Sequence, residues 1–478
     1  MTAEPPRLVV VGGGITGLTA AYRVGQRMPE ADITLIEADE HLGGKIRSSP
    51  FAGIEGVDEG ADAFLTRVPY AAALAKELGL EADLTSPAVG KAYVWWNGLH
   101  PIPEGLMLGV PTDLAKLART KLLTWPGKLR AGLEPILPAT GVGADSVGRL
   151  IRKRFGRQVH ERLVDPLVGS IYAADTDHFS LIGVPQIFDL ASKHRSLLLG
   201  ARRMRAAAPP ATGPIFATPR AGMASLTDAL GAALGRRHVD VRTSTTVTGI
   251  QRASQGWLLR TRGPDGELTI AADAVLLATP ARTTAPLLAD ICPTAATTLA
   301  RFQHAGVVMV TLAIPAADWP EALSGYSGYL VPKPVQRWVT AVSFGSSKWA
   351  HWQPVGAHGE HEVLLRISLG RDGNDLTDRP DHELLEAALG EVGEHLGITL
   401  RPVAERITKW PLAFPQYRPG HADRVSGVER ALAADAPGVF VAGASYRGIG
   451  IPACVQQGER AAESLAEALA GFSGSVRH

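Results

Sequence analysis

The chain has 478 residues, of which 45% are hydrophobic and 20% charged, so it can form two or three globular domains with large cores. Its 48 basic and 47 acidic residues give a net charge of +1, which argues against nucleic-acid binding by phosphate neutralisation. The presence of only two cysteines, Cys292 and Cys454, argues against a disulfide scaffold or a cysteine-rich metal site. We therefore expect no metal and a reducing, cytoplasmic setting.

No run of eighteen apolar residues occurs in the sequence, so we expect no membrane-spanning helix. Glu4 and two prolines precede the first apolar run, and this composition does not suit an export signal. Peripheral contact with the inner face of a membrane is left open.

A glycine cluster follows the first predicted strand, Leu8 to Val11, and precedes an alanine-rich helical segment, Leu18 to Val24. Its spacing fits the G-x-G-x-x-G pattern of dinucleotide-binding turns. In that pattern the first glycine permits the turn, the second lets backbone approach a pyrophosphate, and the third lets the helix pack on the strand. The alternative is a turn that is rich in glycine only for packing. The residues predicted to bind the cofactor here are Gly12, Gly13, Gly14, Ile15, Thr16 and Gly17.

Two further segments extend this predicted site. A second strand, Ile33 to Ile36, ends at Glu37, about twenty residues after the last glycine, where an acid binds the ribose of a dinucleotide. Gly43 and Gly44 then precede Lys45, whose charge suits a loop that passes a diphosphate. An ordinary basic surface loop is the alternative for this second segment.

Small residues at Gly60 and Ala61, followed by Asp62, let the backbone lie against a flat ring system. A helix is predicted from Pro69 to Gly79. Arg67, just before this helix, is either a solvated charge or an anchor for an acidic substrate, and the sequence does not decide between the two.

From about residue 91 to 211 the composition changes. A hairpin is predicted from Val94 to Pro103, and mainly helical stretches follow, one of them from Val147 to Phe155 with Ser146 as its cap. Cations and large apolar residues alternate between about 106 and 130. This mixture favours an amphipathic lid that packs on its own domain, with docking on an anionic membrane surface as the alternative.

The sheet pattern returns after residue 212. A helix is predicted from Gly222 to Leu234, followed by short strands and by a buried strand that ends at Ala278, Thr279 and Pro280. Between residues 301 and 410 alternating strands and one helix, Asp381 to Leu396, indicate a separate antiparallel sheet with covering helices.

The last predicted strand, Gly438 to Ala444, closes on small residues that include Gly443. A glycine-rich turn through Gly450 and Ile451 follows, and Pro452 suits the first position of a final helix. The N-terminus of that helix would direct its dipole at the pyrimidine side of a flavin and favour the reduced, anionic ring. A helix that only packs is the alternative.

Together these segments resemble the protoporphyrinogen/coproporphyrinogen oxidase family within the wider amine-oxidase-like flavoproteins, and most closely its Gram-positive and actinobacterial coproporphyrinogen III oxidases. The resemblance runs nearly from end to end, and its central segment, which amine oxidases lack, is the most specific part. The motifs that carry it are Gly12 to Leu18, Gly60 to Leu65, Pro101 to Thr112, Glu161 to Asp175 and Gly448 to Pro452.

The resemblance implies an α/β (α+β overall) fold with a two-dinucleotide-binding domain, of the glutathione-reductase and amine-oxidase type, that holds FAD non-covalently. It also implies that Val247 lies against the adenine and that Ala278 and Thr279 pass near the cofactor. The implied FAD domain is discontinuous and comprises residues 1–90, 212–300 and 411–478. The helical lid comprises residues 91–211 and the substrate-binding sheet residues 301–410.

For the substrate, the resemblance implies a reduced tetrapyrrole with propionate arms, one of which Arg67 would bind. A backbone carbonyl from the segment with Gly169, Ser170 and Tyr172 would face the macrocycle. In this chain Ser170 and Ala174 stand where the family has glycines, which alters the local geometry.

The implied reaction is the six-electron, oxygen-dependent oxidation of coproporphyrinogen III to coproporphyrin III in haem biosynthesis, with hydrogen peroxide as the second product. The flavin does the chemistry, so no catalytic acid–base pair is expected. Protoporphyrinogen IX oxidation, amine oxidation and a redox-silent flavoprotein are the alternatives. Molecular oxygen and a ferrochelatase that receives the product are the implied partners, while the oligomeric state is left open between monomer and homodimer.

Overall fold

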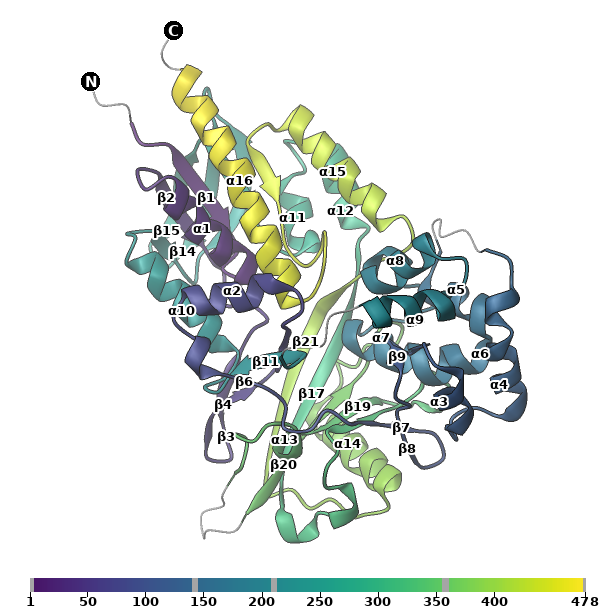
Figure 1. Cartoon of the computed structure of the whole chain (residues 1–478). Helices are drawn as coiled ribbons and strands as arrows, with labels where there is room; N and C mark the ends of the chain where they lie inside the picture. The colour runs from purple at the N-terminus through teal and green to yellow at the C-terminus, as the bar shows by residue number, and fades with distance from the viewer. Residues whose placement is uncertain (1–3, 140–144, 208–212, 355–360, 476–478) are drawn as a thin grey trace.

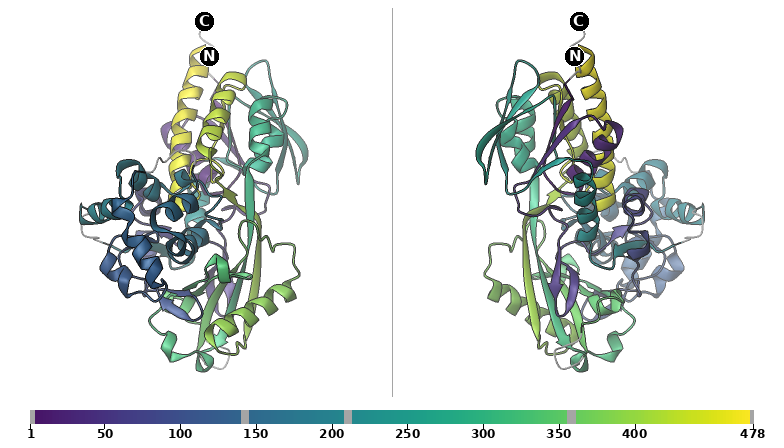
Figure 2. Two further views of the ribbon diagram at one scale, coloured as in Figure 1. Left: turned by 90° about the vertical axis from the view of Figure 1, so that its right-hand side faces the viewer. Right: turned by 90° about the vertical axis from the view of Figure 1, so that its left-hand side faces the viewer.

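The computed structural model describes residues 4–139, 145–207, 213–354 and 361–475. Figure 1 shows a sheet that carries both chain ends at the top, a second sheet at the bottom and a group of helices at the right. The side views in Figure 2 show these helices projecting to one side of the long strands that link the two sheets.

The first predicted strand lies at the centre of a five-stranded parallel sheet. Its residues Leu8 to Val11 are all buried, as expected for a strand that is covered on both faces. The strands, in their order across the sheet, are β12 (Asp240–Arg242), β2 (Asp32–Ile36), β1 (Arg7–Val11), β16 (Ala274–Leu277) and β22 (Val439–Val441).

Alternate residues of β1 enter different cores, because successive strand side chains point to opposite faces. Leu8 and Val10 pack with the first layer, which consists of α1 (Ile15–Arg27), α2 (Pro69–Glu77), α10 (Ala224–Gly235) and α16 (Ile451–Ser475). Val9 and Val11 pack with the second layer, which consists of β13 (Thr246–Arg252), β14 (Trp257–Gly263), β15 (Gly266–Ala272), α11 (Ala281–Leu287), α12 (Pro293–Ala300) and α15 (His421–Asp435).

The second sheet has seven strands and is mixed. The predicted antiparallel pairing is confirmed for the long strands of this sheet. In contrast, β7 (Tyr93–Trp95) pairs in parallel with β18 (Gly328–Leu330), so the hairpin of β7 and β8 (Leu99–Pro101) extends the sheet. Helix α14 (Asp381–Leu396) packs on it. The strands, in order, are β21 (Ala404–Gln416), β17 (Gln303–Pro315), β20 (Glu362–Leu369), β19 (Val339–Phe344), β18 (Gly328–Leu330), β7 (Tyr93–Trp95) and β8 (Leu99–Pro101).

The helical part has its own apolar core. Ser146 accepts a hydrogen bond from the Arg149 N–H and caps α5, as predicted. The elements of this helical part are β9 (Leu106–Met107), β10 (Val110–Pro111), α3 (Leu114–Arg119), α4 (Trp125–Gly132), α5 (Val147–Phe155), α6 (Arg157–Val159), α7 (Asp165–Tyr172), α8 (Pro185–Lys193) and α9 (Leu197–Ala207).

The division into domains stays a prediction, but the pairing bears on its boundaries. The hairpin β7–β8 lies within the predicted lid, yet it hydrogen-bonds to the seven-stranded sheet, and β21 crosses the predicted boundary at residue 410. The boundary predicted at 211/212 lies outside the described residues. Short pairs complete the fold: β3 (Ser48–Phe51) with β4 (Ile54–Asp58), and β11 (Phe216–Pro219) with β5 (Phe64–Leu65) and β6 (Leu84–Thr85).

Candidate cofactor and substrate site

The glycine turn has the geometry of a dinucleotide-binding turn. Gly12 has φ +108°, a conformation that favours glycine. A Cβ at Gly17 would lie 2.0 Å from the Gly12 carbonyl oxygen, so only glycine lets α1 approach β1 this closely. A Cβ at Gly14 would meet nothing within 4 Å, which leaves open space beside the N-terminus of α1. The turn therefore offers free helix N–H groups to an anion. Ile15 and Thr16 form the first turn of α1, where the Thr16 hydroxyl donates to the Cys454 carbonyl at 3.2 Å.

Glu37 lies at this turn, as the sequence predicts. Its carboxylate accepts a hydrogen bond of 2.6 Å from the Gly13 N–H and another of 2.9 Å from the Asp39 N–H. The Thr245 N–H donates to the Glu37 carbonyl at 2.9 Å, which brings the start of β13 beside the acid. Val247 follows in β13 and packs in the second core.

The glycine pair also lies against the turn. The Gly43 N–H donates to the Gly13 carbonyl at 2.9 Å, and a Cβ at Gly44 would lie 3.4 Å from the Gly14 Cα. Both residues have positive φ angles, +103° and +61°, so the loop depends on glycine at these positions. The loop therefore lies against the glycine turn, and its contact with a diphosphate stays a prediction.

Lys45 extends from this loop into the interior and donates to the Ala413 carbonyl in β21. Its side chain keeps a large accessible surface, although burial lowers its pKa to about 8. The surrounding protein therefore destabilises the charged form of Lys45, while part of its side chain stays accessible.

Two more basic side chains lie within electrostatic reach of Lys45. Burial and the neighbouring charges of Lys45 and Arg282 lower the pKa of His304 to about 4, so His304 is neutral at pH 7. Lys45 and Arg282 form no ion pair with any carboxylate in the described part of the chain. Two cations without a counterion beside an open glycine turn suit a dinucleotide diphosphate.

The segment from Gly60 to Asp62 connects this region to the seven-stranded sheet. A Cβ at Gly60 would lie 3.6 Å from the Trp410 ring, so a flat ring of the protein itself packs there, while Ala61 is exposed. The Asp62 carboxylate binds Lys348 at 2.8 Å and Arg366 at 3.1 Å. Burial alone would raise the pKa of Asp62, but these two cations lower it below its ordinary value. Both cations bind the same Asp62 oxygen, Oδ2, which is therefore occupied within the protein.

The carboxyl ends of three parallel strands meet at the same turn. The Ala278 N–H donates to the Val11 carbonyl at 2.8 Å, and the methyl group of Thr279 would lie 3.2 Å from a Cβ at Gly12. A Cβ at Gly443 would lie 3.7 Å from the Ala278 carbonyl oxygen. The structure thus brings together the predicted residues of β1, β16 and β22, at the sheet edge where open α/β sheets bind ligands.

The final helix, α16, begins at Ile451, one residue after Gly450, so Pro452 is its second residue rather than its first. Proline at either position costs no hydrogen bond, because the first N–H groups of a helix have no internal partner. Gln457 organises the preceding turn: its side-chain oxygen accepts from the Gly443 and Arg447 N–H groups, both at 3.2 Å.

The predicted substrate segment forms the C-terminal end of α7. Gly169 is buried, and its carbonyl accepts hydrogen bonds from the N–H groups of Ala173 and Ala174. It is therefore not available to a substrate. The carbonyl of Ser170 accepts no hydrogen bond from any residue that the structure describes. Tyr172 stacks on Phe179 with ring centroids 5.0 Å apart, and burial raises the pKa of its hydroxyl.

Arg67 follows the short strand β5 and is exposed. Within the described ranges its guanidinium has no hydrogen bond and no ion pair. This leaves the charge free for an acidic ligand, and the choice between anchor and solvated charge stays open.

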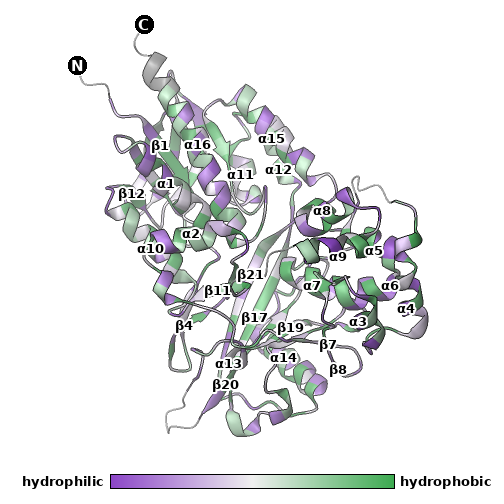
Figure 3. Cartoon of the chain, viewed as in Figure 1, coloured by the Kyte–Doolittle hydropathy of each residue, from purple (hydrophilic) through white to green (hydrophobic). Residues whose placement is uncertain are grey.

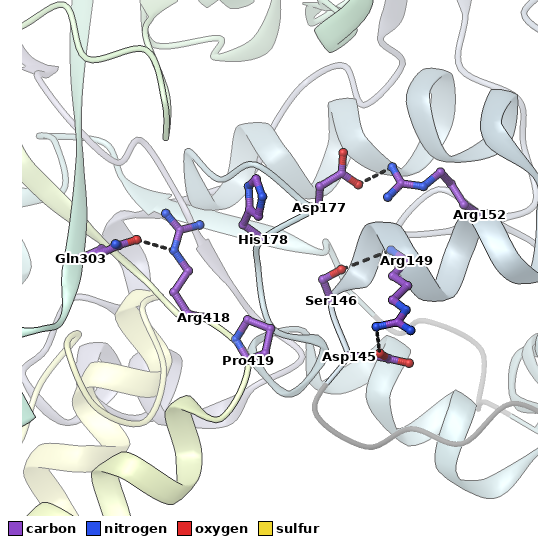
Figure 4. Close-up of a pocket in the computed structure, with 9 residues that line it drawn as sticks. All are labelled: Asp145, Ser146, Arg149, Arg152, Asp177, His178, Gln303, Arg418 and Pro419. Atoms are coloured by element: carbon purple, nitrogen blue, oxygen red, sulfur yellow. Dashed lines mark hydrogen bonds and ion pairs between the residues drawn. The ribbon is translucent and has the colours of Figure 1, made fainter.

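The cavity in Figure 4, about 520 Å³ in volume, lies between α5 and the chain around Arg418. It contains three arginines, but Arg152 binds Asp177, Arg149 lies 3.4 Å from Asp145, and Arg418 binds Asp372 with two bonds of 2.7 Å. Because each cation already has a counterion, this cavity is a weaker anion site than the one around Lys45 and Arg282.

The helical part carries several exposed apolar side chains. Trp125 is 71% exposed, Leu129 69% and Ile136 73%, and the Lys128 ammonium lies 4.8 Å from the centre of the Trp125 ring. Figure 3 shows that hydrophobic residues otherwise concentrate in the strands of the parallel sheet and on the inner helices of this part. Within the described chain no helix combines the length and apolarity needed to cross a bilayer.

Sequence reasoning missed Arg282, His304, Trp410 and Gln457. Arg282 follows the strand that ends at Pro280, and the rule that ligands bind at the carboxyl ends of parallel strands could have found it. The other three carry no local signal, because their roles come from contacts with residues far away in the sequence. No cluster of potential metal ligands is found among the described residues.

Comparisons with known proteins show the family of this chain. The profile of the family "Flavin containing amine oxidoreductase" matches residues 15–466. Coproporphyrinogen III oxidase of Bacillus subtilis (strain 168) is 33% identical to this chain, over 96% of this chain and 98% of the relative. The enzyme of the same name from Mycobacterium tuberculosis H37Rv is 34% identical, over 97% of this chain and 98% of the relative.

Solved structures have the same fold. A protein from Exiguobacterium sp. 255-15, provisionally assigned as a protoporphyrinogen oxidase, matches with a TM-score of 0.84 and 31% identity over 97% of this chain and 99% of its own. Cyclohexylamine oxidase from Brevibacterium oxydans IH-35A matches with a TM-score of 0.68 and 18% identity, over 97% of this chain and 99% of its own. At this low identity the match shows only that the two proteins share a fold. The chain therefore belongs to the flavin-containing amine oxidoreductase family and, within it, to the protoporphyrinogen/coproporphyrinogen III oxidases.

Proposed function

We propose that this protein oxidises coproporphyrinogen III to coproporphyrin III with molecular oxygen, as an enzyme of haem biosynthesis in the cytoplasm. The observation that carries the proposal is the match, over 96–97% of the chain at 33–34% identity, to relatives named coproporphyrinogen III oxidase in two bacterial phyla. Protoporphyrinogen IX oxidation is the second candidate, supported by the Exiguobacterium structure and by a chloroplast protoporphyrinogen oxidase from Oryza sativa at 27% identity. Amine oxidation is a more remote alternative, supported only by the fold.

We propose FAD, bound non-covalently, as the flavin. The glycine turn would bind its diphosphate, Glu37 its ribose, and the N-terminus of α16 the ring, with Lys45 and Arg282 as counterions. The open space at Gly14 and the absence of carboxylate partners for these two cations within the described chain support this fit. When bound, the flavin supplies the acceptor for the electrons of the porphyrinogen and returns them to oxygen as hydrogen peroxide.

The chain's own contribution is to bind and orient the substrate. Arg67 would bind a propionate, and the free Ser170 carbonyl would accept a hydrogen bond from a pyrrole N–H. In the same proposal, residues 1–90, 212–300 and 411–478 form the FAD domain, residues 91–211 the lid and residues 301–410 the substrate sheet. Product transfer to a ferrochelatase and peripheral contact of α4 with a membrane stay proposals of the same kind.

The test of the function is anaerobic stopped-flow absorbance of the flavin band, with coproporphyrinogen III and protoporphyrinogen IX mixed separately with the holoenzyme. We expect fast bleaching by coproporphyrinogen III only. Faster bleaching by protoporphyrinogen IX would reverse the choice between the two substrates. No bleaching by either would contradict both and leave amines as the substrates to try.

Replacing Arg67 by Ala is expected to raise KM for coproporphyrinogen III, because a charge-assisted hydrogen bond contributes about 1.5–3 kcal/mol, or about tenfold or more in affinity. The kcat is expected to change little, since the bond forms equally with substrate and transition state. Steady-state kinetics with Arg67→Lys as the control separates charge from geometry. An unchanged KM in Arg67→Ala would remove Arg67 from the substrate site.

The pKa of Lys45 predicts a pH dependence of flavin binding. Its value of about 8 lies below the ordinary 10.5, so the flavin-free protein binds this proton less tightly than the unfolded chain and gains stability as pH rises between these values. A bound diphosphate favours the charged form of Lys45 instead. Flavin affinity is therefore expected to fall as pH rises above 8, by up to about tenfold per unit.

A flavin fluorescence titration between about pH 6.5 and 9.5 measures this effect in wild type and in Lys45→Met. The two titratable neighbours His304 and Cys454 do not change charge in that range, because the pKa of His304 is about 4 and the pKa of Cys454 is about 11. Lys45→Met is expected to bind flavin more weakly than wild type does, with an affinity that does not fall above pH 8. An equal loss in both proteins would contradict the role of Lys45.

A further inference from the structure

The C-terminal end of α7 is held by the last residue of β21 and by the turn that follows β20. The carbonyl of Tyr172 accepts a hydrogen bond from Gln416 Nε2 at 3.2 Å. The carbonyl of Ala173 accepts one from the Asp372 N–H at 2.8 Å, and that of Ala174 accepts one from Arg371 Nη2. Three successive carbonyls are thus fixed from the sheet that packs against this helix.

Arg371 lies along the side of α7 and contacts both of its ends. It is 6% exposed, and its two terminal nitrogens donate to the Asp165 carboxylate at 3.0 and 3.2 Å. Burial alone would raise the pKa of Asp165, but the attraction of Arg371 lowers it below its ordinary value. A Cβ at Gly169 would lie only 2.9 Å from Arg371 Nη2, so the glycine provides room for the guanidinium. The space that Arg371 needs therefore explains why residue 169 is glycine, and no contact between Gly169 and a substrate is required.

Gln416 is the last residue of β21 and is 3% exposed. Its Nε2 lies 3.2 Å from the Tyr172 carbonyl, 3.4 Å from that of Ala173 and 3.2 Å from that of Phe414. Because all three neighbours are acceptors, the amide must present its NH₂ group to them. Its Oε1 is buried and has no hydrogen-bond partner in the described chain. The Gln416 amide is therefore held by the carbonyls of Tyr172, Ala173 and Phe414, and it fixes those of Tyr172 and Ala173 in turn.

A second contact supports the clamp that Arg371 and Gln416 form. Arg418 binds the Asp372 carboxylate with two hydrogen bonds of 2.7 Å. It also donates to the Gln303 side chain at 2.6 Å (Figure 4). This pairing fixes the turn whose backbone N–H binds Ala173. The left-handed conformation of Ala173, φ +47°, is thereby stabilised by the sheet although alanine disfavours it.

The carbonyls of Tyr172, Ala173 and Ala174 are therefore occupied. In the last turn of α7, the carbonyls of Ser170 and Ile171 accept no hydrogen bond from a described residue. We propose that Arg371 and Gln416 are positioning residues, which hold the end of α7 so that the Ser170 carbonyl faces the tetrapyrrole. The proposal rests on the proposed function, because it assumes that this carbonyl binds the substrate. Arg371 and Gln416 themselves do not touch the reacting atoms.

The test uses Gln416→Leu, which removes the donor to α7 and leaves no unpaired charge. The matched control is Gln336→Leu, since the Gln336 amide donates to the Val331 carbonyl at 3.1 Å and forms no hydrogen bond with α7 within the described chain. We expect Gln416→Leu to raise KM for coproporphyrinogen III about tenfold, with kcat and flavin affinity within about twofold of wild type. The control is expected to keep the wild-type KM.

Hydrogen exchange followed by mass spectrometry provides a readout that needs no substrate. Amides of residues 169–175 are expected to exchange about tenfold faster in Gln416→Leu than in wild type or in Gln336→Leu. Arg371→Lys, which keeps the charge beside Asp165 but cannot reach both ends of α7, is expected to give the same two results.

The outcomes separate the two proposals. If wild type does not oxidise coproporphyrinogen III, the proposed function fails, and the positioning role fails with it. If wild type is active and Gln416→Leu keeps its KM, or if both glutamine variants raise KM equally, only the positioning role is overturned. Unchanged exchange at residues 169–175 in Gln416→Leu would overturn the clamp itself.

Discussion

Gly17→Ala is expected to destabilise the flavin-free protein by about 3 kcal/mol and to abolish flavin binding at micromolar concentrations. The added Cβ would lie 2.0 Å from the Gly12 carbonyl oxygen and 3.2 Å from the Ala278 Cβ, so α1 must move away from the sheet. Overpacking of this kind costs about 1–3 kcal/mol, and backbone rather than a flexible side chain opposes it here. The same movement displaces the helix N-terminus that would bind the diphosphate.

Two glycines of the same region serve as controls. Gly25→Ala, in the interior of α1, places its Cβ 3.6 Å from its neighbours and is expected to gain about 0.5–1 kcal/mol, because alanine favours helix. Gly14→Ala clashes with nothing within 4 Å, and at φ −70° it is expected to cost at most about 1 kcal/mol as a poorer cap. If a diphosphate lies against Gly14, this variant nevertheless loses flavin affinity. Urea unfolding of the flavin-free proteins and flavin titrations measure the two effects separately.

The results for the three variants distinguish a cofactor turn from a packing turn. A cofactor turn gives loss of affinity without loss of stability in Gly14→Ala and loss of both in Gly17→Ala. Full flavin affinity in Gly14→Ala would contradict the assignment of the turn to the diphosphate. Wild-type stability in Gly17→Ala would contradict the close contact of α1 and β1.

The sequence predicted most of the secondary structure, together with the glycine turn, the acid and the small residues at the carboxyl edge of the parallel sheet. Those predictions depend on local signals: a strand that ends in glycines, an acid after the next strand, and apolar periodicity. α14 was predicted with the bounds that it has, because a helical period extends over its whole length. Each signal lies within a window of a few residues, so the fold need not be known to find it.

Features that depend on distant contacts were not predictable. Nothing near Asp62 in the sequence shows that Lys348 and Arg366 neutralise its carboxylate, more than 280 residues away. The hairpin β7–β8 is short and lies before the predicted lid helices, and only its parallel pairing with β18 assigns it to the sheet. The hydrogen bonds to the Gly169 carbonyl were not predictable either, because they come from the Ala173 and Ala174 N–H groups and depend on how α7 ends. Charge pairs and edge strands are decided by tertiary structure, on which local propensity has little influence.

Glu134 forms a buried ion pair with Arg154 that the sequence did not predict. Glu134→Ala is expected to lower the free energy of unfolding by about 3–5 kcal/mol. Glu134 and Arg154 are 0% and 1% exposed, and Arg154 Nε donates to the carboxylate at 2.8 Å. The same carboxylate accepts the Leu197 N–H at 2.8 Å and the Leu198 N–H at 3.2 Å, at the start of α9. Removing it leaves a buried guanidinium without its counterion and helix N–H groups without an acceptor.

The control is an exposed pair of the same chemistry. Arg262 and Glu267 lie 2.7 Å apart in the β14–β15 hairpin, with side chains 70% and 73% exposed. Glu267→Ala is expected to change the free energy of unfolding by less than about 1 kcal/mol, because water screens the pair. Urea unfolding followed by tryptophan fluorescence, with limited proteolysis of the helical part, compares the two variants. Equal effects in both would contradict the structural role of Glu134.

The double variant Glu134→Leu/Arg154→Met tests why the loss is large. If the cost of Glu134→Ala comes from the unpaired charge, removing both charges recovers most of it, since a buried ion pair is often no more stable than apolar residues of similar volume. About 1 kcal/mol is expected to remain lost, because the N–H groups of α9 still lack their acceptor. A double variant as unstable as Glu134→Ala would instead assign the whole cost to those backbone groups. The helical part would then depend on Glu134 as a cap for α9 rather than as a counterion for Arg154.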